Sequence, residues 1–163
     1  MDRSGERIWK CLTVCQPWAW CIVHGPKQWE NRSWRCHYRG PLLIHAGRSR
    51  ARLTPEVYDW LSRRGIEPPP PQQLVYGAII GVCKLVDCLP VEQLPTDPWA
   101  DGPWCLKLAD ARPLPQPIPC QGKLRLFDAK LAADQVSLLK STLAADAPAC
   151  RQGPSYDTIE PVL

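Results

Sequence analysis

Apolar residues in this chain come in short runs, and residues that favour turns separate one run from the next. Because many of the runs are rich in β-branched and aromatic residues, they predict short strands. Gly77 and Gly81 lie in the strongest run and indicate a bend or bulge in that strand. The predicted strands cover residues 8–15, 29–36, 40–46, 76–88, 104–108 and 123–127.

Three segments have the pattern of helices. Pro17 suits the first position of a helix of about two turns, which Gly25 ends. Thr54 has the hydroxyl of an N-cap and begins a second helix, which Gly65 ends. Residues 128–145 have the composition of a third helix, with apolar residues roughly in phase.

Proline-rich segments predict the connections between these elements. Residues 67–71 read as a surface linker with polyproline character, and residues 112–119 read as a loop. We expect the tail over residues 146–163 to be poorly ordered. Residues 1–145 then form a single α+β domain, mainly β, built as a small, partly open β-barrel. It has five to six strands, two short inserted helices and a C-terminal helix.

Composition narrows the class of protein. The 163 residues suffice for one domain with a sizeable core, and 19 prolines argue against long regular elements. Every apolar run is shorter than the ~18 residues of a membrane-spanning helix. The first seven residues lack the apolar region of a secretory signal. We therefore expect a cytoplasmic protein, or a nuclear one in a eukaryote, that is monomeric and does not associate with membranes.

Nine cysteines raise the question of metal or redox chemistry. Their odd number and the expected lack of export argue against a disulfide framework. The chain contains no C-x-x-C motif, and neither Cys11 with Cys15 nor Cys83 with Cys88 has a matching pair at zinc-site spacing. We expect most of the thiols to fill core volume, and we expect neither a metal nor a cofactor.

Positive charge is concentrated in one stretch. Residues 24–52 hold seven basic side chains against one acid, a local charge of +6, whereas the other 13 basic and 15 acidic side chains sum to −2. A basic face on a nearly neutral body fits a phosphate-bearing partner, and a solvated, solubilising surface explains the charge equally well. The seven basic residues are Lys27, Arg32, Arg35, Arg39, Arg48, Arg50 and Arg52.

The stretch over residues 16–46 organises the rest of the chain. Four of the eight tryptophans lie between Trp18 and Trp34, and the same stretch holds two opposite charges, Lys27 and Glu30. Rigid aromatic side chains beside fixed charges suit a flat, polar ring such as a nucleobase. This stretch is therefore the predicted ligand site.

This stretch contains three distinctive blocks: Gln16-Pro17-Trp18-Ala19, Gly25-x-Lys27-x-x-Glu30-x-Arg32 and Arg39-Gly40-Pro41-Leu42-Leu43-Ile44-His45-Ala46. The three blocks resemble the ASCH domain family, a branch of the PUA-like superfamily. The later segments Gly77 to Cys88, Gly102-Pro103-Trp104 and Pro117 to Gly122 are similar to that family as well, so the resemblance runs from about Leu12 to Phe127.

The resemblance implies a PUA-like β-barrel with a cleft beside its first helix and a role in binding RNA or another nucleic acid. Some members of the family are hydrolases, and one branch removes the acetyl group from N4-acetylcytidine. The residues carried over from that branch are a lysine, here Lys27, and a threonine three positions later. This chain has Glu30 at that second position and so lacks the hydroxyl nucleophile of that branch.

A nucleic-acid-binding module is the first of three functions that the residues support. In it, a base of single-stranded or modified RNA stacks on tryptophan in a cleft, and arginines clamp the phosphates. Trp18 is the first choice for stacking, although at least one of the tryptophans only fills core. The predicted ligand-binding residues are Trp18, Lys27, Glu30, Arg32, Trp34 and Arg39.

Two other functions stay open. A hydrolase acting on N4-acetylcytidine or RNA would use Lys27 and Glu30 as catalytic acid and base, and a structural salt bridge is the other interpretation of that pair. A protein-interaction domain would dock its proline-rich loops, residues 67–71 and 112–119, on a partner. His45 lies in a predicted buried strand, where we expect a hydrogen-bonded core imidazole rather than a base.

Overall fold

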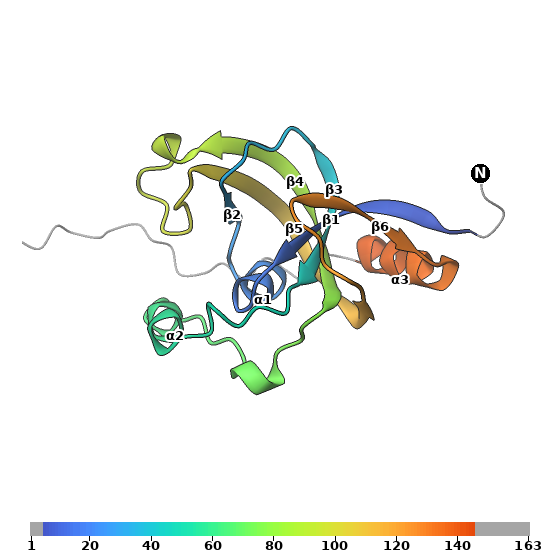
Figure 1. The fold of residues 1–163 in the computed structure, drawn as a ribbon, viewed down its shortest axis with the longest axis horizontal. Helices are drawn as coiled ribbons and strands as arrows, with labels where there is room; N and C mark the ends of the chain where they lie inside the picture. Colours follow the sequence, from blue (N-terminus) through green and yellow to red (C-terminus); the bar gives the residue numbers. More distant parts are fainter. Residues whose placement is uncertain (1–4, 146–163) are drawn as a thin grey trace, which may run out of the picture.

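The computed structural model describes residues 5–145, and these form one mixed sheet that curls into a partly open barrel (Figure 1). The order across the sheet is β2-β5-β4-β3-β1-β6. β1 and β3 run parallel, and the other neighbouring pairs run antiparallel. The predicted mainly-β, partly open barrel is confirmed. The strands are β1 (Arg7–Val14), β2 (Trp29–Arg32), β3 (Gly40–Ala46), β4 (Ala78–Pro90), β5 (Trp104–Pro119) and β6 (Leu126–Leu131).

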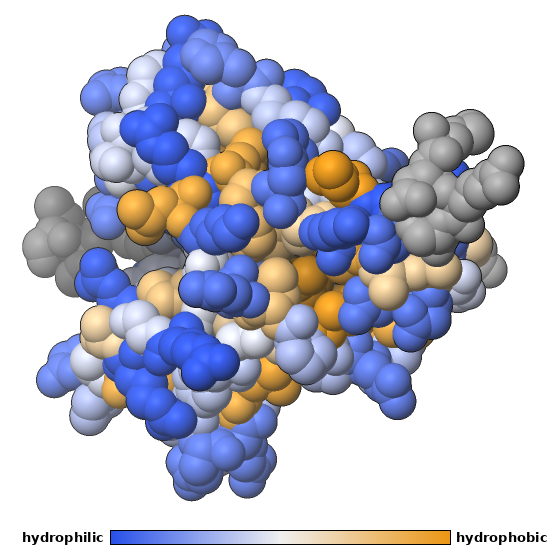
Figure 2. Space-filling view, turned by 45° about the vertical axis from the view of Figure 1, so that its right-hand side comes forward, coloured by the Kyte–Doolittle hydropathy of each residue, from blue (hydrophilic) through white to orange (hydrophobic). Residues whose placement is uncertain are grey.

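Helices cover the sheet at two places. α1 packs across β3, β4 and β5, and α3 packs against β5 (Figure 1). In Figure 2, hydrophobic residues line a hollow across the middle of one face, and hydrophilic residues surround it. The helices are α1 (Trp18–Val23), α2 (Pro55–Ser62) and α3 (Ala133–Ala144), with short 3-10 turns η1 (Pro71–Gln73) and η2 (Val91–Gln93).

The sequence signals for the first two helices act locally. Thr54 caps α2, because its hydroxyl oxygen accepts a hydrogen bond of 3.3 Å from the Val57 N–H. Gly65 follows α2 with a φ of +71°, a left-handed conformation that favours glycine. α1 has only six residues, so packing rather than intrinsic propensity stabilises it. Its buried face consists of Ala19, Cys21, Ile22 and Val23.

Buried side chains form three clusters. One lies between the sheet and α1, around Leu12, Leu42 and Ile44. A second joins the other side of the sheet to α3, through Val136 and Leu139. The third joins α1 and α2 to the ends of β2 and β5 and contains Trp29, Leu61 and Trp99. This third cluster contains the aromatic residues that surround the predicted ligand site.

The prediction of a loop over residues 112–119 is wrong, because β5 continues to Pro119. The four prolines of this segment stand at every second position, from Pro113 to Pro119. Backbone N–H groups of a strand alternate between its two edges, so these prolines remove donors from one edge only. The Cys120 N–H still donates to the Gly77 carbonyl, over 3.2 Å. The two ends of the segment therefore pair with β4, at Arg112–Pro113 and at Ile118–Pro119, and residues 114–117 between them bulge out of the register.

Two element boundaries also differ from the prediction. Residues 128–131 belong to β6 and not to the last helix, because Phe127, Ala129 and Leu131 alternate inward and the strand pairs with β1. α3 begins only at Ala133. The strand predicted over residues 29–36 is shorter than expected and ends at Arg32, where its pairing with β5 ends.

Two further expectations concern order and membranes. The tail predicted to be poorly ordered, residues 146–163, lies outside the described residues. None of the described helices combines the length and the apolar character needed to cross a membrane.

The prediction that most cysteines fill core volume is confirmed for the described residues. Six of the eight described cysteines are buried: Cys11, Cys21, Cys36, Cys83, Cys88 and Cys105. Burial raises the pKa of Cys21 and of Cys83 to about 12, from an ordinary value of 9.0. Both thiols therefore stay protonated in the folded protein well above pH 9.

These two thiols should make the stability depend on pH. In the unfolded chain they lose their protons near pH 9, whereas the folded protein keeps them bound. Each therefore favours the folded state fully below pH 9, and this contribution falls by about 1.4 kcal/mol per pH unit as the pH rises towards 12. Urea unfolding on either side of pH 9 measures the loss. The double variant Cys21→Ala, Cys83→Ala should lose correspondingly less, and an equal loss would contradict the assignment.

Close packing at Gly81 should make that position intolerant of a side chain. A Cβ there would lie 2.5 Å from Val23 Cγ2 and 2.8 Å from the Arg112 carbonyl oxygen. We expect Gly81→Ala to destabilise the protein by about 1–3 kcal/mol in urea unfolding, because α1 would have to move off β4. Gly65→Asn is the control, since that position is open and asparagine tolerates a positive φ. Equal stability of both variants would contradict this packing.

Candidate functional site

The turn after α1 and β2 bring four of the predicted ligand-binding residues together. Lys27 Nζ lies 3.5 Å from Glu30 Oε2, and Glu30 Oε1 lies 3.1 Å from Arg32 Nη2. The Lys27 ammonium also lies 5.7 Å from the ring centroid of Trp18. A lysine, a glutamate, an arginine and an indole therefore converge on one place. Glu30 stands between the two cations.

This place is filled by the protein itself. Lys27 is 5% exposed and Glu30 is 8% exposed. A tryptophan not included in the sequence prediction, Trp99, lies 5.4 Å from Lys27 Nζ and packs edge-on against Trp18 with centroids 6.2 Å apart. Trp60 packs against both of these indoles. We call Trp18, Trp60 and Trp99 the tryptophan cluster; it covers the charges rather than leaving a free ring face beside them.

The buried charges connect parts of the backbone. Lys27 Nζ donates a hydrogen bond to the Trp29 carbonyl oxygen, and Arg32 Nη2 donates to the Thr13 carbonyl oxygen over 2.7 Å. The second bond ties β2 to the end of β1. A catalytic role for Lys27 and Glu30 stays a prediction, because a substrate would have to reach side chains that the tryptophan cluster covers.

The other two predicted ligand-binding residues have different surroundings. Arg39 donates to the carbonyl oxygens of Cys36 and Tyr38 and lies 3.4 Å from Asp87. Trp34 is half-buried, and the guanidinium of Arg125 lies 5.5 Å from its ring centroid. Arg39 therefore fastens the connection between β2 and β3 to β4, whereas Trp34 meets the connection between β5 and β6.

The basic side chains of residues 24–52 do not form one surface. Lys27 is buried, and the guanidinium of Arg35 lies 5.4 Å from the Trp104 ring. Arg48, Arg50 and Arg52 are exposed in the connection between β3 and α2. Arg48, the first of this group, lines an open cavity.

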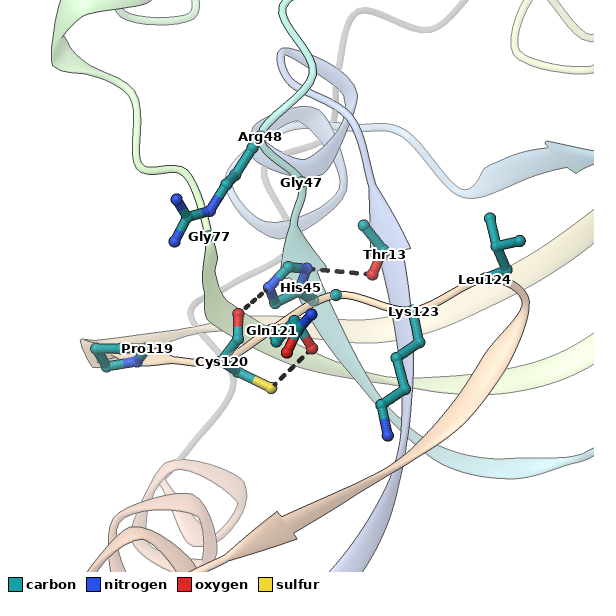
Figure 3. A pocket seen from close by; sticks show the side chains of 11 residues that line it. Thr13, His45, Gly47, Arg48, Gly77, Pro119, Cys120, Gln121, Lys123 and Leu124 are labelled. Atoms are coloured by element: carbon teal, nitrogen blue, oxygen red, sulfur yellow. Dashed lines mark hydrogen bonds between the residues drawn. The ribbon is translucent and has the colours of Figure 1, made fainter.

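That cavity has a volume of about 820 Å³ and lies where β1 and β3 end, beneath the connection between β5 and β6 (Figure 3). Its described lining includes two basic side chains, Arg48 and Lys123, and no acidic one. The sequence prediction missed it because its walls come from four separate segments. The lining residues are Thr13, His45, Gly47, Arg48, Gly77, Pro119, Cys120, Gln121, Gly122, Lys123 and Leu124.

A chain of hydrogen bonds crosses the floor of the cavity (Figure 3). His45 Nε2 lies 2.6 Å from the Cys120 carbonyl oxygen, and because a carbonyl only accepts, Nε2 carries the proton. In the neutral ring Nδ1 then accepts from the Thr13 hydroxyl, over 3.2 Å. His45 is thus the buried, hydrogen-bonded imidazole that its strand predicted, and the lone pairs of the Thr13 hydroxyl are left for a ligand.

Gly122 lets the β5–β6 connection lie close to this floor. A Cβ at Gly122 would stand 2.8 Å from Thr13 Oγ1 and 2.9 Å from His45 Cε1. Any larger residue would therefore force the connection, or the side chains of Thr13 and His45, to shift. The turn that contains Gly122 belongs to the segments that resemble the ASCH family, and this was the available sequence signal for the cavity.

Removing the charge of Glu30 should destabilise the fold. Glu30→Gln leaves Lys27 buried without its counter-charge, so we expect a loss of about 3–5 kcal/mol in the free energy of unfolding by urea. Lys84→Ala is the control, because the Lys84–Asp110 pair is 57% and 58% exposed and its loss should cost under about 1 kcal/mol. A loss of the same small size in both variants would show that the buried charges do not hold the structure.

Part of the chain is similar to curated proteins from two mammals. Activating signal cointegrator 1 from Homo sapiens and that from Mus musculus are each 35% identical to it over 88 residues. The match covers 51% of this chain and 15% of the relative, so the chain spans a small part of the length of these curated relatives.

Solved structures share the fold. Crystal structures of ASCH from Zymomonas mobilis and of a mutant of the same protein superpose with a TM-score of 0.50 at 16% and 15% identity. They cover 81% of this chain and 93% and 96% of their own chains. The family model described as ASCH domain matches residues 12–100, which is more than half of the sequence. The chain belongs to the ASCH domain family.

Proposed function

We propose that this chain is a nucleic-acid-binding domain that holds one nucleotide of a single-stranded or modified RNA in the cavity beneath the β5–β6 connection. The cavity itself carries the proposal. Its volume of about 820 Å³ lies within the range of about 300–1,000 Å³ that small ligands occupy. ASCH domains are associated with nucleic acids, so this ligand class agrees with the family.

The floor of the cavity suits the edge of a base. The Thr13 hydroxyl donates to His45 and keeps its lone pairs for a donor on the ligand. Gln121 adds an amide, which can donate and accept at the same time. Unpaired bases of RNA are read through hydrogen bonds to such edges. The pocket therefore offers contacts to a base without a buried charge to neutralise.

The mouth of the cavity suits phosphates. Arg48 comes from the connection after β3 and Lys123 from the β5–β6 connection, and Arg50 and Arg52 follow Arg48 in the same exposed connection. Guanidinium groups bind phosphate oxygens in pairs, and a lysine adds a point charge. Since the described lining has no acid, an anionic backbone meets attraction along the whole mouth.

The charged residues beneath the tryptophan cluster support this site in the proposal. Arg32 donates to the Thr13 carbonyl, Glu30 pairs with Arg32, and Lys27 pairs with Glu30. The side chain of Thr13 then faces the cavity at a fixed place. In this proposal the ligand lies in the cavity and not in the Trp-lined cleft expected from the sequence, and Trp18 packs against its neighbours instead of stacking on a base.

Salt dependence tests the proposal. We expect the affinity for a short, labelled single-stranded RNA, measured by fluorescence anisotropy, to fall as salt rises, because bound phosphates release counterions. Lys123→Ala should weaken binding and reduce the slope of log K against log salt by about 0.7, the value for one phosphate contact on a single strand.

Lys84→Ala is the matched control for this measurement. It removes the same charge from an exposed position on β4. Lys84 lies six residues, roughly 20 Å along the strand, from Ala78, which is the strand residue next to the cavity. This variant should bind like the wild type. Binding that ignores salt, or that Lys84→Ala weakens as much as Lys123→Ala does, would overturn the proposal.

A further inference from the structure

Leu124 is the most exposed large hydrophobic residue among the described ones, at 93%. A single exposed apolar side chain is common on protein surfaces and needs no function by itself. This one, however, stands at the mouth of the cavity, and its two neighbours in the sequence are the basic residues Lys123 and Arg125. In Figure 3, Lys123 and Leu124 leave the connection in opposite directions.

The connection that carries Leu124 is fixed on both sides. Before it, the Cys120 carbonyl is held by His45, and Gly122 lies against the cavity floor. After it, Arg125 adopts a φ of +59°, and its guanidinium lies over the ring of Trp34. A side chain held on such a support loses little conformational freedom when it binds. The backbone contacts on both sides therefore fix the position of Leu124 relative to the cavity.

We propose that Leu124 is a wedge that inserts between stacked base pairs and that the base it displaces enters the neighbouring cavity. This inference rests on the proposed function, the binding of one nucleotide in the cavity, and extends its ligands from single-stranded RNA to a base-paired RNA helix from which one nucleotide is turned out. Proteins that unstack helical nucleic acids use aliphatic side chains of this kind. Turning a base out of the stack then exposes its edge to a pocket.

The chemistry of the residue favours insertion over stacking. A base that is already free is held best by a flat aromatic ring, which the isobutyl group of Leu124 does not offer. A branched aliphatic group is compact enough to enter a base step, and Lys123 and Arg125 can meet the phosphates that flank the step. Thr13 and Gln121 in the cavity next to Leu124 can then bond to the displaced base.

An RNA hairpin with one 2-aminopurine in its stem tests the wedge, because this base fluoresces more strongly when it leaves the stack. We expect the wild-type protein to raise the fluorescence on binding. Leu124→Ala should abolish the rise and weaken binding to the hairpin by about tenfold or more, since it removes the group that replaces the lost stacking. Binding of Leu124→Ala to a single-stranded RNA of the stem sequence should stay within about twofold of the wild type, because that strand has no paired stack to open.

Two variants complete the experiment. Ile8→Ala removes the same number of carbons from another exposed site, 68% exposed near the start of β1, and should change neither arm. Leu124→Met keeps an aliphatic wedge and should retain the fluorescence rise. If Leu124→Ala leaves hairpin binding unchanged, or weakens both RNAs equally, the wedge is wrong while binding stands. If the wild type binds neither RNA, the proposed function itself fails.

Discussion

The parallel pairing of β1 with β3 is the constraint on which the candidate site depends. Both strands end at the same edge of the sheet, and the register sets Thr13 beside His45. Side chains at one level of neighbouring strands share a face, which brings the hydroxyl within 3.2 Å of the imidazole. The chain that leaves β3 then supplies Gly47 and Arg48 to the same end. An antiparallel pair would place these two strand ends at opposite edges.

The buried charges contact this arrangement through the backbone of Thr13. Glu30 lies between two cations, Lys27 and Arg32, and Arg32 also donates a hydrogen bond to the Thr13 carbonyl. A buried ion cluster contributes little net stability compared with apolar packing, but it fixes geometry, because each partner has one set of bonds that satisfies it. In this chain the family's Gly-x-Lys-x-x-Glu-x-Arg segment is thus joined to the wall of the neighbouring cavity through the bond from Arg32 to Thr13.

Elements whose signals lie within a few residues could be predicted from the sequence, whereas elements that depend on strand pairing could not. The Thr54 cap and the apolar run Gly40–Ala46 depend on neighbours a few residues away, so the sequence predicts them. Residues 112–119 and 128–131 have compositions that suggest a loop and a helix, yet both are strand: β4 pairs with the two ends of the first segment and β1 pairs with the second. The cavity escaped prediction for the same reason, since residues as distant as Thr13 and Gly122 meet only in the folded chain.

The alternate prolines of β5 have a consequence for how the molecule behaves at high concentration. β2 pairs with β5 only at Trp104–Lys107, so within the described residues the outer edge of the proline segment has no neighbouring strand. An exposed edge of this length normally invites pairing with a second molecule and so aggregation or domain swapping. A run of positions without N–H donors cannot complete such a ladder. The same prolines that disguise the strand in the sequence therefore protect the folded protein from self-association through that edge.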